Sequence, residues 1–344
     1  MGQGSCGCGC GQPPLTTLSP LEGPPRNLTT TITWRDVLGG WKVRWGLRRM
    51  KYRVTPGLYR VGMPDSGSPV LVTANYKLTV DTVRRSLAGL DVWLLVLDTK
   101  GVNVWCAAGK GTFGTTELVR RIQAANLREV VKHRELVLPQ LGATGVAAHE
   151  VKRATGFSVH YGPVRARDIA AYLAAGMQAT RAMRRVTFGW KERLAVAPVE
   201  VVAALRPLLA VIALVAALDL FRHHGLTRNA LTGMLPFLAA VVTGGVLVPL
   251  LLPWLPFRAF AHKGAVAGAL AAGALLLWRP LPAVEAAGAA LLIVAITSYM
   301  AMTFTGSTTF TTLAGVRREV RRALPLILIA AAAGAILQFT GAFI

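Results

Sequence analysis

The chain contains little cysteine and little acid. Only 4 of its 344 residues are Cys, and 16 Asp and Glu stand against 38 Lys and Arg, a formal net charge of +22 at pH 7. Cys6, Cys8 and Cys10 lie in the first ten residues, and the fourth cysteine is Cys106. The first eleven residues hold no apolar segment, so we predict no secretory signal. A reducing, cytoplasmic compartment is then expected, in which the cysteines are thiols or metal ligands and not disulfides.

Ionisable residues are scarce in the C-terminal part, where long apolar stretches predict membrane spans. The chain is 53% hydrophobic with a mean hydropathy of +0.47, and the excess lies after residue 198. A hydrocarbon core is crossed by about 20 apolar residues. The expected spans are Val199–Phe221, Asn229–Leu252, Phe260–Trp278, Pro282–Thr303 and Ala323–Phe343. Prolines in or beside the first two stretches leave a count of four open.

Basic residues flank these stretches unevenly. They gather before the first, between the second and third, and before the fifth: Arg181, Arg184, Arg185, Lys191, Arg193, Arg258, Lys263, Arg317, Arg318, Arg321 and Arg322. The other two loops carry only Arg222, Arg228 and Arg279. The positive-inside rule then predicts a multi-pass protein of the cytoplasmic membrane with its N-terminal part in the cytoplasm. The net charge is thus explained by membrane-flanking positions and not by a nucleic-acid partner, and a few of these arginines are also expected to contact anionic lipid.

Between about residues 59 and 175 the pattern predicts a Rossmann-like α/β domain with a mainly parallel sheet. Short apolar runs typical of strands buried on both faces alternate with amphipathic stretches typical of helices. The expected strands are Pro69–Ala74, Val92–Leu97, Leu136–Leu138 and Phe157–His160. The expected helices are Thr79–Leu87, Thr115–Ala125, Val146–Thr155 and Arg165–Ala175.

These patterns divide the chain into five segments. Residues 1–30 are expected to be a disordered leader rich in Cys, Gly and Pro, and residues 31–57 a lead-in that packs on the next domain or lies at the membrane surface. Residues 58–178 form the expected α/β domain, 179–198 a basic linker, and 199–344 an all-α transmembrane domain of about five helices.

One cysteine lies where α/β proteins bind ligands. Residues 101–111 (GVNVWCAAGKG) follow the strand Val92–Leu97, at its carboxyl end. We expect Asn103 to cap a short helix beginning near Val104, and Ala107 and Ala108 to leave a flat surface for a large planar ring. Nucleotide phosphate is not expected, because the phosphate-loop spacing fails on both sides of Gly109-Lys110. The alternative is that Cys106 is a small buried hydrophobe.

This run closely resembles the Asn-Val-Trp-Cys-Ala-Ala-Gly-Lys signature of the corrinoid protein of the microbial mercury-methylation pair. Residues 72–79 (VTANYKLT) and 303–311 (TFTGSTTFT) are similar to that family as well. The resemblance implies a cytoplasmic domain similar to the corrinoid-binding domain of the corrinoid iron-sulfur protein large subunit, fused to a membrane domain.

The resemblance also implies a site. Cys106 would be the lower axial ligand of the cobalt of a cobalamin-type corrinoid, in keeping with the lack of any histidine at the Asp-x-His spacing of the commonest corrinoid module. Thr73 and Asn75 would face the ring. The residues that would shape the cap helix are Asn103, Val104, Trp105, Ala107, Ala108, Gly109 and Lys110.

The implied activity is a corrinoid-dependent methyltransferase that moves a methyl group from Cys-ligated methyl-Co(III) to Hg(II), forming methylmercury. Hg(II) is an electrophile, so the methyl group must leave with electron density, and an anionic sulfur stabilises the Co(III) left behind. With Cys106 in use, three cysteines are too few for an all-cysteine iron-sulfur cluster, so a separate reductant is needed. The resemblance names a small ferredoxin-like partner with two 4Fe-4S clusters, and a folate-linked methyl donor system.

Several interpretations stay open. The chain can instead be a membrane-anchored corrinoid methyl carrier with another acceptor, or a transporter with a regulatory α/β domain. Cys6, Cys8 and Cys10 either capture soft Hg(II) or form an unstructured tail. The hydroxyl-rich loop Phe304–Gly315 either docks the α/β domain or is a polar turn.

Overall fold

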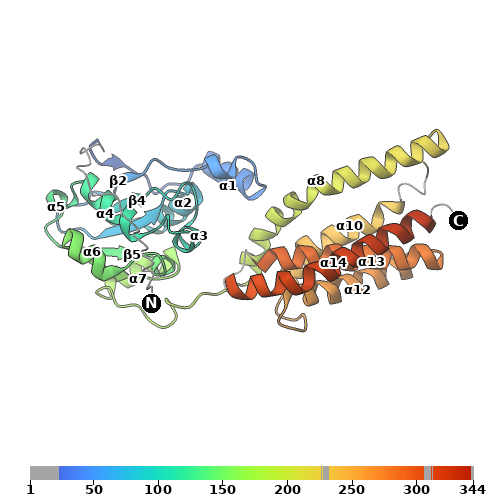
Figure 1. The fold of residues 1–344 in the computed structure, drawn as a ribbon. Helices are drawn as coiled ribbons and strands as arrows, with labels where there is room; N and C mark the ends of the chain where they lie inside the picture. Colours follow the sequence, from blue (N-terminus) through green and yellow to red (C-terminus); the bar gives the residue numbers. More distant parts are fainter. Residues whose placement is uncertain (1–22, 226, 228–231, 306–310, 312, 342–344) are drawn as a thin grey trace, which may run out of the picture. The chain divides into compact units, whose positions relative to one another are not determined.

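The computed structural model describes residues 23–225, 227, 232–305, 311 and 313–341. The chain divides into two compact units (Figure 1). The α/β unit takes in the chain up to Gly40 together with Arg48–Arg185, and the helical unit takes in Trp41–Leu47 and the chain from Val186. The expected combination of a mainly parallel α/β sheet with an all-α region is confirmed.

A six-stranded sheet forms the centre of the α/β unit. Its order is β1-β2-β4-β3-β5-β6, and all neighbouring strands are parallel except β2 and β4. The strands are β1 (Arg26–Asn27), β2 (Gly57–Val61), β3 (Val70–Ala74), β4 (Val92–Leu97), β5 (Glu135–Leu138) and β6 (Ser158–Tyr161). The four expected strands are confirmed to within one residue at each end, whereas β1 and β2 were not predicted. Ala74 pairs with Leu97, so β3 and β4 end side by side.

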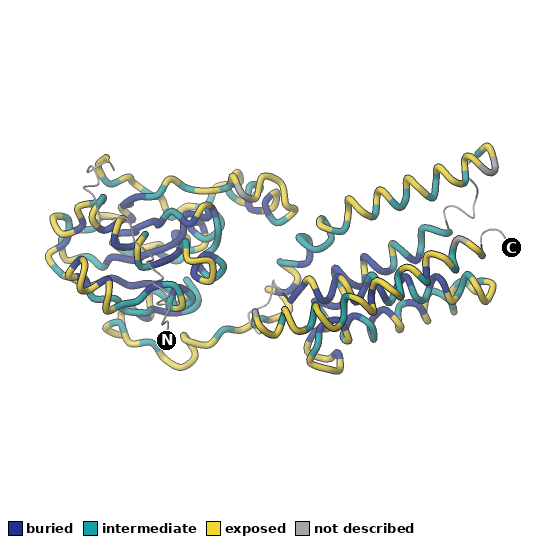
Figure 2. Tube along the Cα trace, in the orientation of Figure 1, coloured by how far each residue is buried: buried dark blue, intermediate teal, exposed yellow. Residues whose placement is uncertain are grey.

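Helices cover both faces of this sheet, which is why β3 and β4 are buried at every position (Figure 2). One face packs on α3 (Val104–Gly109), α4 (Thr115–Ala124) and α6 (Ala148–Thr155), and the other on α2 (Lys77–Ser86) and α7 (Ile169–Ala174). These helices confirm the four expected ones and the short cap helix. Two details differ: a 3₁₀ turn (Ala166–Asp168) precedes α7, and α5 (Leu127–Val130) was not predicted.

The helical unit contains four helices that are long and apolar enough to cross a membrane. These fall within α8 (Trp190–His223), α12 (Phe260–Trp278), α13 (Ala283–Phe304) and α14 (Leu313–Gly341). The expected second span is instead a shorter apolar run: α10 (Leu235–Val242), a π-helical turn (Thr243–Leu247) and α11 (Val248–Leu251). Pro249 lacks the N–H that would bond to the carbonyl of residue 245, which accounts for the irregular turn. By length and composition the described spans therefore number four.

Three of these helices pack through glycines. A Cβ on Gly268 of α12 would lie 2.9 Å from Val294 Cα, and one on Gly264 would lie 2.6 Å from the Thr297 carbonyl oxygen, both in α13. Gly288 of α13 and Gly334 of α14 approach each other in the same way. Small residues let helix backbones come close where lipid offers no hydrophobic drive for association. Almost all positions of α8, by contrast, are exposed or half-buried (Figure 2).

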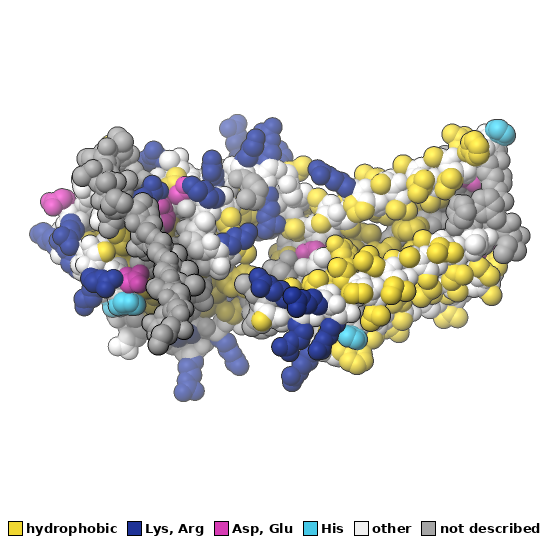
Figure 3. All heavy atoms as spheres, in the orientation of Figure 1, with side chains coloured by type: hydrophobic (Ala, Val, Ile, Leu, Met, Phe, Trp, Pro, Cys, Tyr) yellow, Lys and Arg dark blue, Asp and Glu magenta, His cyan; other side chains and the backbone are white. Residues whose placement is uncertain are grey.

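The beginnings of α8, α12 and α14 lie at one end of the helical unit. Ala261 N–H donates to Glu319 Oε1 at 2.7 Å, which joins the starts of α12 and α14. The rings of Phe188, just before α8, and Phe304, at the end of α13, are 6.2 Å apart. Figure 3 shows Lys and Arg gathered at this end and hydrophobic side chains over most of the remaining visible face. Basic residues near the starts of α8 and α14, which are more than 100 positions apart in the sequence, thus lie at the same end of the helical unit.

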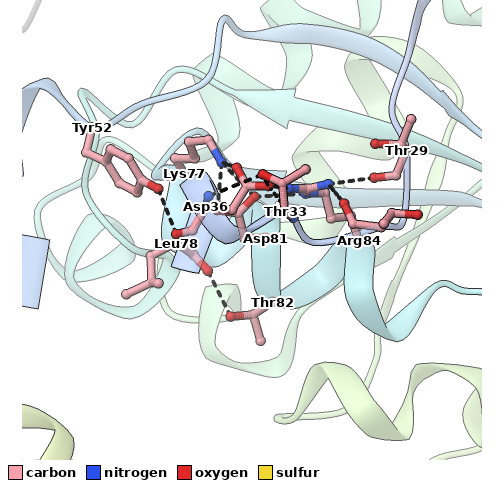
Figure 4. A network of polar contacts seen from close by, with 10 residues as sticks. Thr29, Thr33, Asp36, Tyr52, Lys77, Leu78, Asp81, Thr82 and Arg84 are labelled. Carbon is pink, nitrogen blue, oxygen red and sulfur yellow. Dashed lines mark hydrogen bonds and ion pairs between the residues drawn. The ribbon is translucent and has the colours of Figure 1, made fainter. Parts of the chain in front are cut away.

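A charged network ties α1 (Trp34–Arg44) and the segment before it to α2 (Figure 4). Asp36 accepts from Lys77 Nζ at 2.6 Å and from Arg84 Nη2 at 2.8 Å, and both cations also contact Asp81. Arg84 Nη1 donates to the carbonyls of Thr29 (2.8 Å) and Thr31 (2.6 Å). Burial would raise the pKa of Asp36, but hydrogen bonds from Lys77, Thr33 and Arg84 outweigh it and hold the pKa below its ordinary value. This part of the lead-in therefore packs on the α/β unit.

We expect this network to lose its stabilising effect in acid. Because the folded pKa of Asp36 is depressed, its contribution is present above the unfolded pKa and is lost as pH falls below about 5. Asp36→Asn should lower the free energy of unfolding of the α/β unit by about 3 kcal/mol at neutral pH, since it leaves Lys77 and Arg84 with one carboxylate, Asp81, in place of two. Hydrogen exchange of amides in α2, corrected for intrinsic rates between pH 7 and 3, measures both effects. Glu129→Gln, at an exposed position of α5, is the control; equal protection in both variants would contradict the prediction.

Glycine packing in the helical unit gives a second prediction. Gly268→Leu should separate α12 from α13 and lower the apparent melting temperature of the detergent-solubilised protein by about 5 °C or more, the effect of a few kcal/mol of overpacking. Gly273→Leu is the matched control, because a Cβ there meets no atom within 4 Å. Equal melting temperatures for the two variants would show that the close approach of α12 and α13 at Gly268 does not contribute to stability.

Candidate functional site

The site lies at the edge of the sheet where β3 and β4 end. After Leu97 the chain turns through Asp98–Gly101 and enters α3 at Val104. Lys100 (φ 59°) and Gly101 (φ 76°) are both left-handed. The single hydroxyl hydrogen of Thr99 is shared between the Val102 carbonyl (2.6 Å) and Asn75 Oδ1 (2.9 Å), which closes the turn. A non-glycine residue in this conformation is uncommon, so the surroundings must hold it.

Asn75, the residue after β3, holds this turn. Its Oδ1 accepts from Thr99 N–H (3.1 Å), Thr99 Oγ1 (2.9 Å) and Gly101 N–H (3.0 Å). Its Nδ2 donates to Asp98 Oδ1 at 3.1 Å. Asn75 is 1% exposed, so its amide is committed to the turn and does not present a polar group to the surface. Asn75 thus supports the turn that leads into α3.

Asp98 links the turn to the next helix. Its carboxylate accepts from Lys100 Nζ at 2.7 Å, and its N–H donates to Glu117 Oε1 of α4 at 2.9 Å. Burial would raise the pKa of Asp98, but the hydrogen bonds from Lys100 and Asn75 outweigh it and keep the pKa below its ordinary value. Sequence reasoning missed Asp98, Lys100 and Glu117 as supports of the turn. A run of polar residues directly after a buried strand was the available signal.

Helix α3 presents Cys106 on its outer side. Asn103 Oδ1 accepts the Cys106 N–H at 2.9 Å, so the expected cap is confirmed and the cysteine backbone is held in the first turn. Trp105 and Cys106 are half-buried, and Gly109 and Lys110 are exposed. Residues three apart on a helix share a face, so Gly109 lies beside Cys106, and a Cβ there would meet no atom within 4 Å. Cys106 therefore has open space next to it and is not a core hydrophobe.

The expected flat surface of Ala107 and Ala108 is wrong in direction. The two residues are 0% and 5% exposed and pack into the core with Val104. The loop after β5 seals this inner side, because a Cβ on Gly145 would lie 3.0 Å from Ala108 Cα. The small side chains of Ala107 and Ala108 let α3 lie close to the rest of the domain. The outer surface of the helix is formed by Trp105, Cys106, Gly109 and Lys110.

Thr73 is the penultimate residue of β3. It is 2% exposed, and its hydroxyl has no hydrogen-bond partner. Alternation along the strand puts it on the sheet face of Leu71, opposite to the face that packs on α3. Cys6, Cys8 and Cys10 lie outside the described residues, as do residues 306–310 and 312 of the loop Phe304–Gly315.

Comparison with known proteins extends over the α/β unit. Residues 47–173 match a family model described as CO dehydrogenase/acetyl-CoA synthase delta subunit. The chain is 38% identical over 127 residues to the acetyl-CoA decarbonylase/synthase complex subunit gamma of Methanopyrus kandleri, covering 36% of this chain and 27% of that protein. For the subunit gamma of Methanothermobacter thermautotrophicus the identity is 35% over 151 residues, covering 42% and 32%. The match thus spans about a quarter to a third of these relatives, and the α/β unit is similar to part of such a subunit.

We expect the turn to depend on Asn75. Asn75→Ala removes the acceptor of three donors at once and should destabilise the α/β unit by about 3 kcal/mol, because the donors remain buried. Hydrogen exchange should show loss of protection at the Thr99 and Gly101 amides. Asn75→Asp keeps the acceptor oxygen but brings a second carboxylate to Asp98, so an intermediate effect is expected. Unchanged exchange at both amides in Asn75→Ala would contradict the assigned role.

Proposed function

We propose that the α/β unit binds a corrinoid with Cys106 as the protein ligand of its cobalt. The observation that carries this is the position of Cys106: half-buried, next to open space, on the outer side of a short helix at the carboxyl edge of the sheet. Ligands of open α/β sheets bind at that edge. The resemblance of residues 101–111 to the corrinoid protein of the mercury-methylation pair names the cofactor.

The residues present fit such a group. Among the described residues no cluster of three or more His, Cys, Asp or Glu can hold a bare metal ion. A corrinoid macrocycle brings its own equatorial nitrogens, so a single sulfur from the protein completes the donor set. Gly109 and Lys110 leave the outer surface of α3 uncovered beside the sulfur.

The chain's own residues then have distinct tasks. Asn103 holds the backbone of Cys106, because its Oδ1 accepts a hydrogen bond from the Cys106 N–H. Asn75 holds the turn that leads into α3. Trp105 and Lys110 flank the sulfur on the helix surface, while Val104, Ala107 and Ala108 hold the helix against the core. When bound, the corrinoid supplies a cobalt-carbon bond from which a methyl group can be transferred. These contacts hold α3 in place and so keep the Cys106 sulfur at one position.

We further propose that the methyl acceptor is Hg(II), so that the protein is a mercury-methylating methyltransferase. Hg(II) accepts a methyl group with its electron pair, and a thiolate ligand favours that mode of departure. Electrons come from a separate small ferredoxin-like protein with two 4Fe-4S clusters, and methyl groups from a folate-linked donor system. The relatives are named as subunits of a complex, which agrees with dependence on protein partners. Cys6, Cys8 and Cys10 are proposed to capture Hg(II).

The helical unit is proposed to lie in the cytoplasmic membrane with its basic end inward. The starts of α8, α12 and α14 lie at one end, and the basic residues near those starts therefore share it. The positive-inside rule assigns such an end to the cytoplasm. The methyltransferase unit then works on the cytoplasmic side.

Comparison of wild type with Cys106→Ala tests the proposal. Each protein is supplied with methylcobalamin, reductant and the ferredoxin-like partner, and both the optical spectrum and the methylmercury formed from Hg(II) are measured. The variant should lose the sulfur-to-cobalt charge-transfer signal and at least about 100-fold in methylmercury, since even changes behind a metal ligand cost up to that factor. Thr116→Ala, at an exposed position at the start of α4, should keep both.

The outcomes separate the alternatives. Corrinoid binding without methylmercury would favour a membrane-anchored methyl carrier with another acceptor. Failure of wild type to bind corrinoid would overturn the assignment and favour a transporter with a regulatory α/β domain. An unchanged spectrum in Cys106→Ala would remove Cys106 as the cobalt ligand.

A further inference from the structure

A buried arginine in the helical unit has donor atoms without acceptors. Arg193, near the start of α8, is 5% exposed. Its Nε and Nη1 atoms are buried and have no hydrogen-bond partner. Its guanidinium carbon lies 5.9 Å from the centre of the Trp254 ring. A guanidinium in such a place is costly unless an anion reaches it, because burial removes its water without replacing the hydrogen bonds.

The surroundings of Arg193 are apolar on one side and interfacial on the other. An apolar cluster of Leu252, Leu255 and Phe304, with Phe188 and Val196 packed against it, includes the residue after Trp254 and a residue three positions after Arg193. Trp254 and Phe257 are 72% and 63% exposed. Exposed aromatic rings at the ends of apolar helices are typical of the level of lipid headgroups. The Arg193 guanidinium thus lies near the boundary between hydrocarbon and water.

The neighbouring cation is already in use. Lys263 Nζ donates to the carbonyl oxygens of Leu252 (2.9 Å) and Leu255, at the end of α11 and just beyond it. Lys191 lies over the ring of Trp190 at 5.5 Å and is exposed. Arg193 differs from both because its donors are buried and unmatched. A phosphate oxyanion offers several charged acceptor oxygens to a guanidinium whose donors are unmatched.

We propose that Arg193 and Trp254 form a binding site for a phosphate oxyanion, supplied by the headgroup of a phospholipid. The lipid source is favoured because α8 continues from this point as an apolar helix with many exposed side chains, including Leu205 and Leu209, so acyl chains can lie along it. Phosphate groups of the inner leaflet lie at the depth where basic residues gather. The inference rests on the helical unit lying in a membrane and is independent of the corrinoid.

The test uses the full chain in neutral detergent after removal of lipid. Phosphatidylglycerol, diacylglycerol with the same chains, or inorganic phosphate is added, and the apparent melting temperature and the lipids retained in native mass spectrometry are measured. Phosphatidylglycerol should raise the melting temperature of wild type by about 3–5 °C, and one phospholipid per chain should be retained. Diacylglycerol, which lacks the phosphate, should have no such effect.

Arg193→Met should abolish the response to phosphatidylglycerol and, without lipid, should melt at the same or a higher temperature, because it removes an unpaired buried charge. Lys191→Met is the matched control: it removes an exposed charge two residues away and should keep the response. Arg193→Lys keeps the charge without the fork and should give a weaker response. If Arg193→Met fails to fold, the proposal is tested by the two remaining measurements. Arg193→Lys should respond more weakly than wild type to phosphatidylglycerol, and wild type should retain one phospholipid per chain.

The proposal is overturned if Arg193→Met responds like wild type, if Lys191→Met loses the response to the same extent, or if diacylglycerol acts as well as phosphatidylglycerol. A full response to inorganic phosphate alone would keep the oxyanion site and reject the lipid as its source. Since none of these measurements involves cobalt, their failure and the failure of the methyltransferase proposal are distinguishable.

Discussion

The candidate site depends on the side-chain amide of Asn75. One oxygen of this buried side chain accepts three hydrogen bonds from the turn after β4, and its nitrogen reaches Asp98. Those contacts hold Lys100 and Gly101 in left-handed conformations and so set where α3 begins. The parallel pairing of β3 with β4 brings Asn75 to this turn in the first place. The position of Cys106 therefore follows from a residue 31 places earlier in the chain, through strand pairing and one amide.

A second polar arrangement carries the lead-in onto the same unit. Asp36, Lys77, Asp81 and Arg84 form a network whose members alternate in charge, and Arg84 also binds the carbonyls of the segment before α1. Both arrangements start from the segment that follows β3: Asn75 supports the turn on one side, and Lys77 and Arg84 hold the lead-in on the other. A short stretch of sequence thus organises two separate regions, because a strand end in the middle of a sheet has neighbours on both sides.

Packing in the helical unit has a different physical basis. Glycines at the contacts of α12, α13 and α14 let backbones approach to van der Waals distance, while α8 keeps many of its apolar side chains exposed. This antiparallel packing gathers basic residues from distant parts of the sequence at one end. Most of them are exposed, and Arg193 is the exception among those near the start of α8. A charge that is buried without an acceptor is an incomplete arrangement, and this is why it indicates a ligand.

Local patterns in the sequence determined much of this protein. Apolar runs and amphipathic spacing predicted four strands and four flanking helices close to their observed bounds, because burial on both faces of a sheet leaves a local composition signal. They also predicted four long apolar helices, although α8 and α14 begin 9 and 10 residues before the predicted spans Val199–Phe221 and Ala323–Phe343. The Asn103 cap was predictable for the same reason, since a cap acts within three residues. Only the tertiary structure decided what depends on distant partners: the pairing of β1 and β2, the irregular run Leu235–Leu251 in place of a fifth long helix, the inward direction of Ala107 and Ala108, and the use of Asn75 as a support. Hydrogen bonds and close contacts between residues far apart in the chain leave no periodic trace in either partner, so their geometry appears only once the chain is folded.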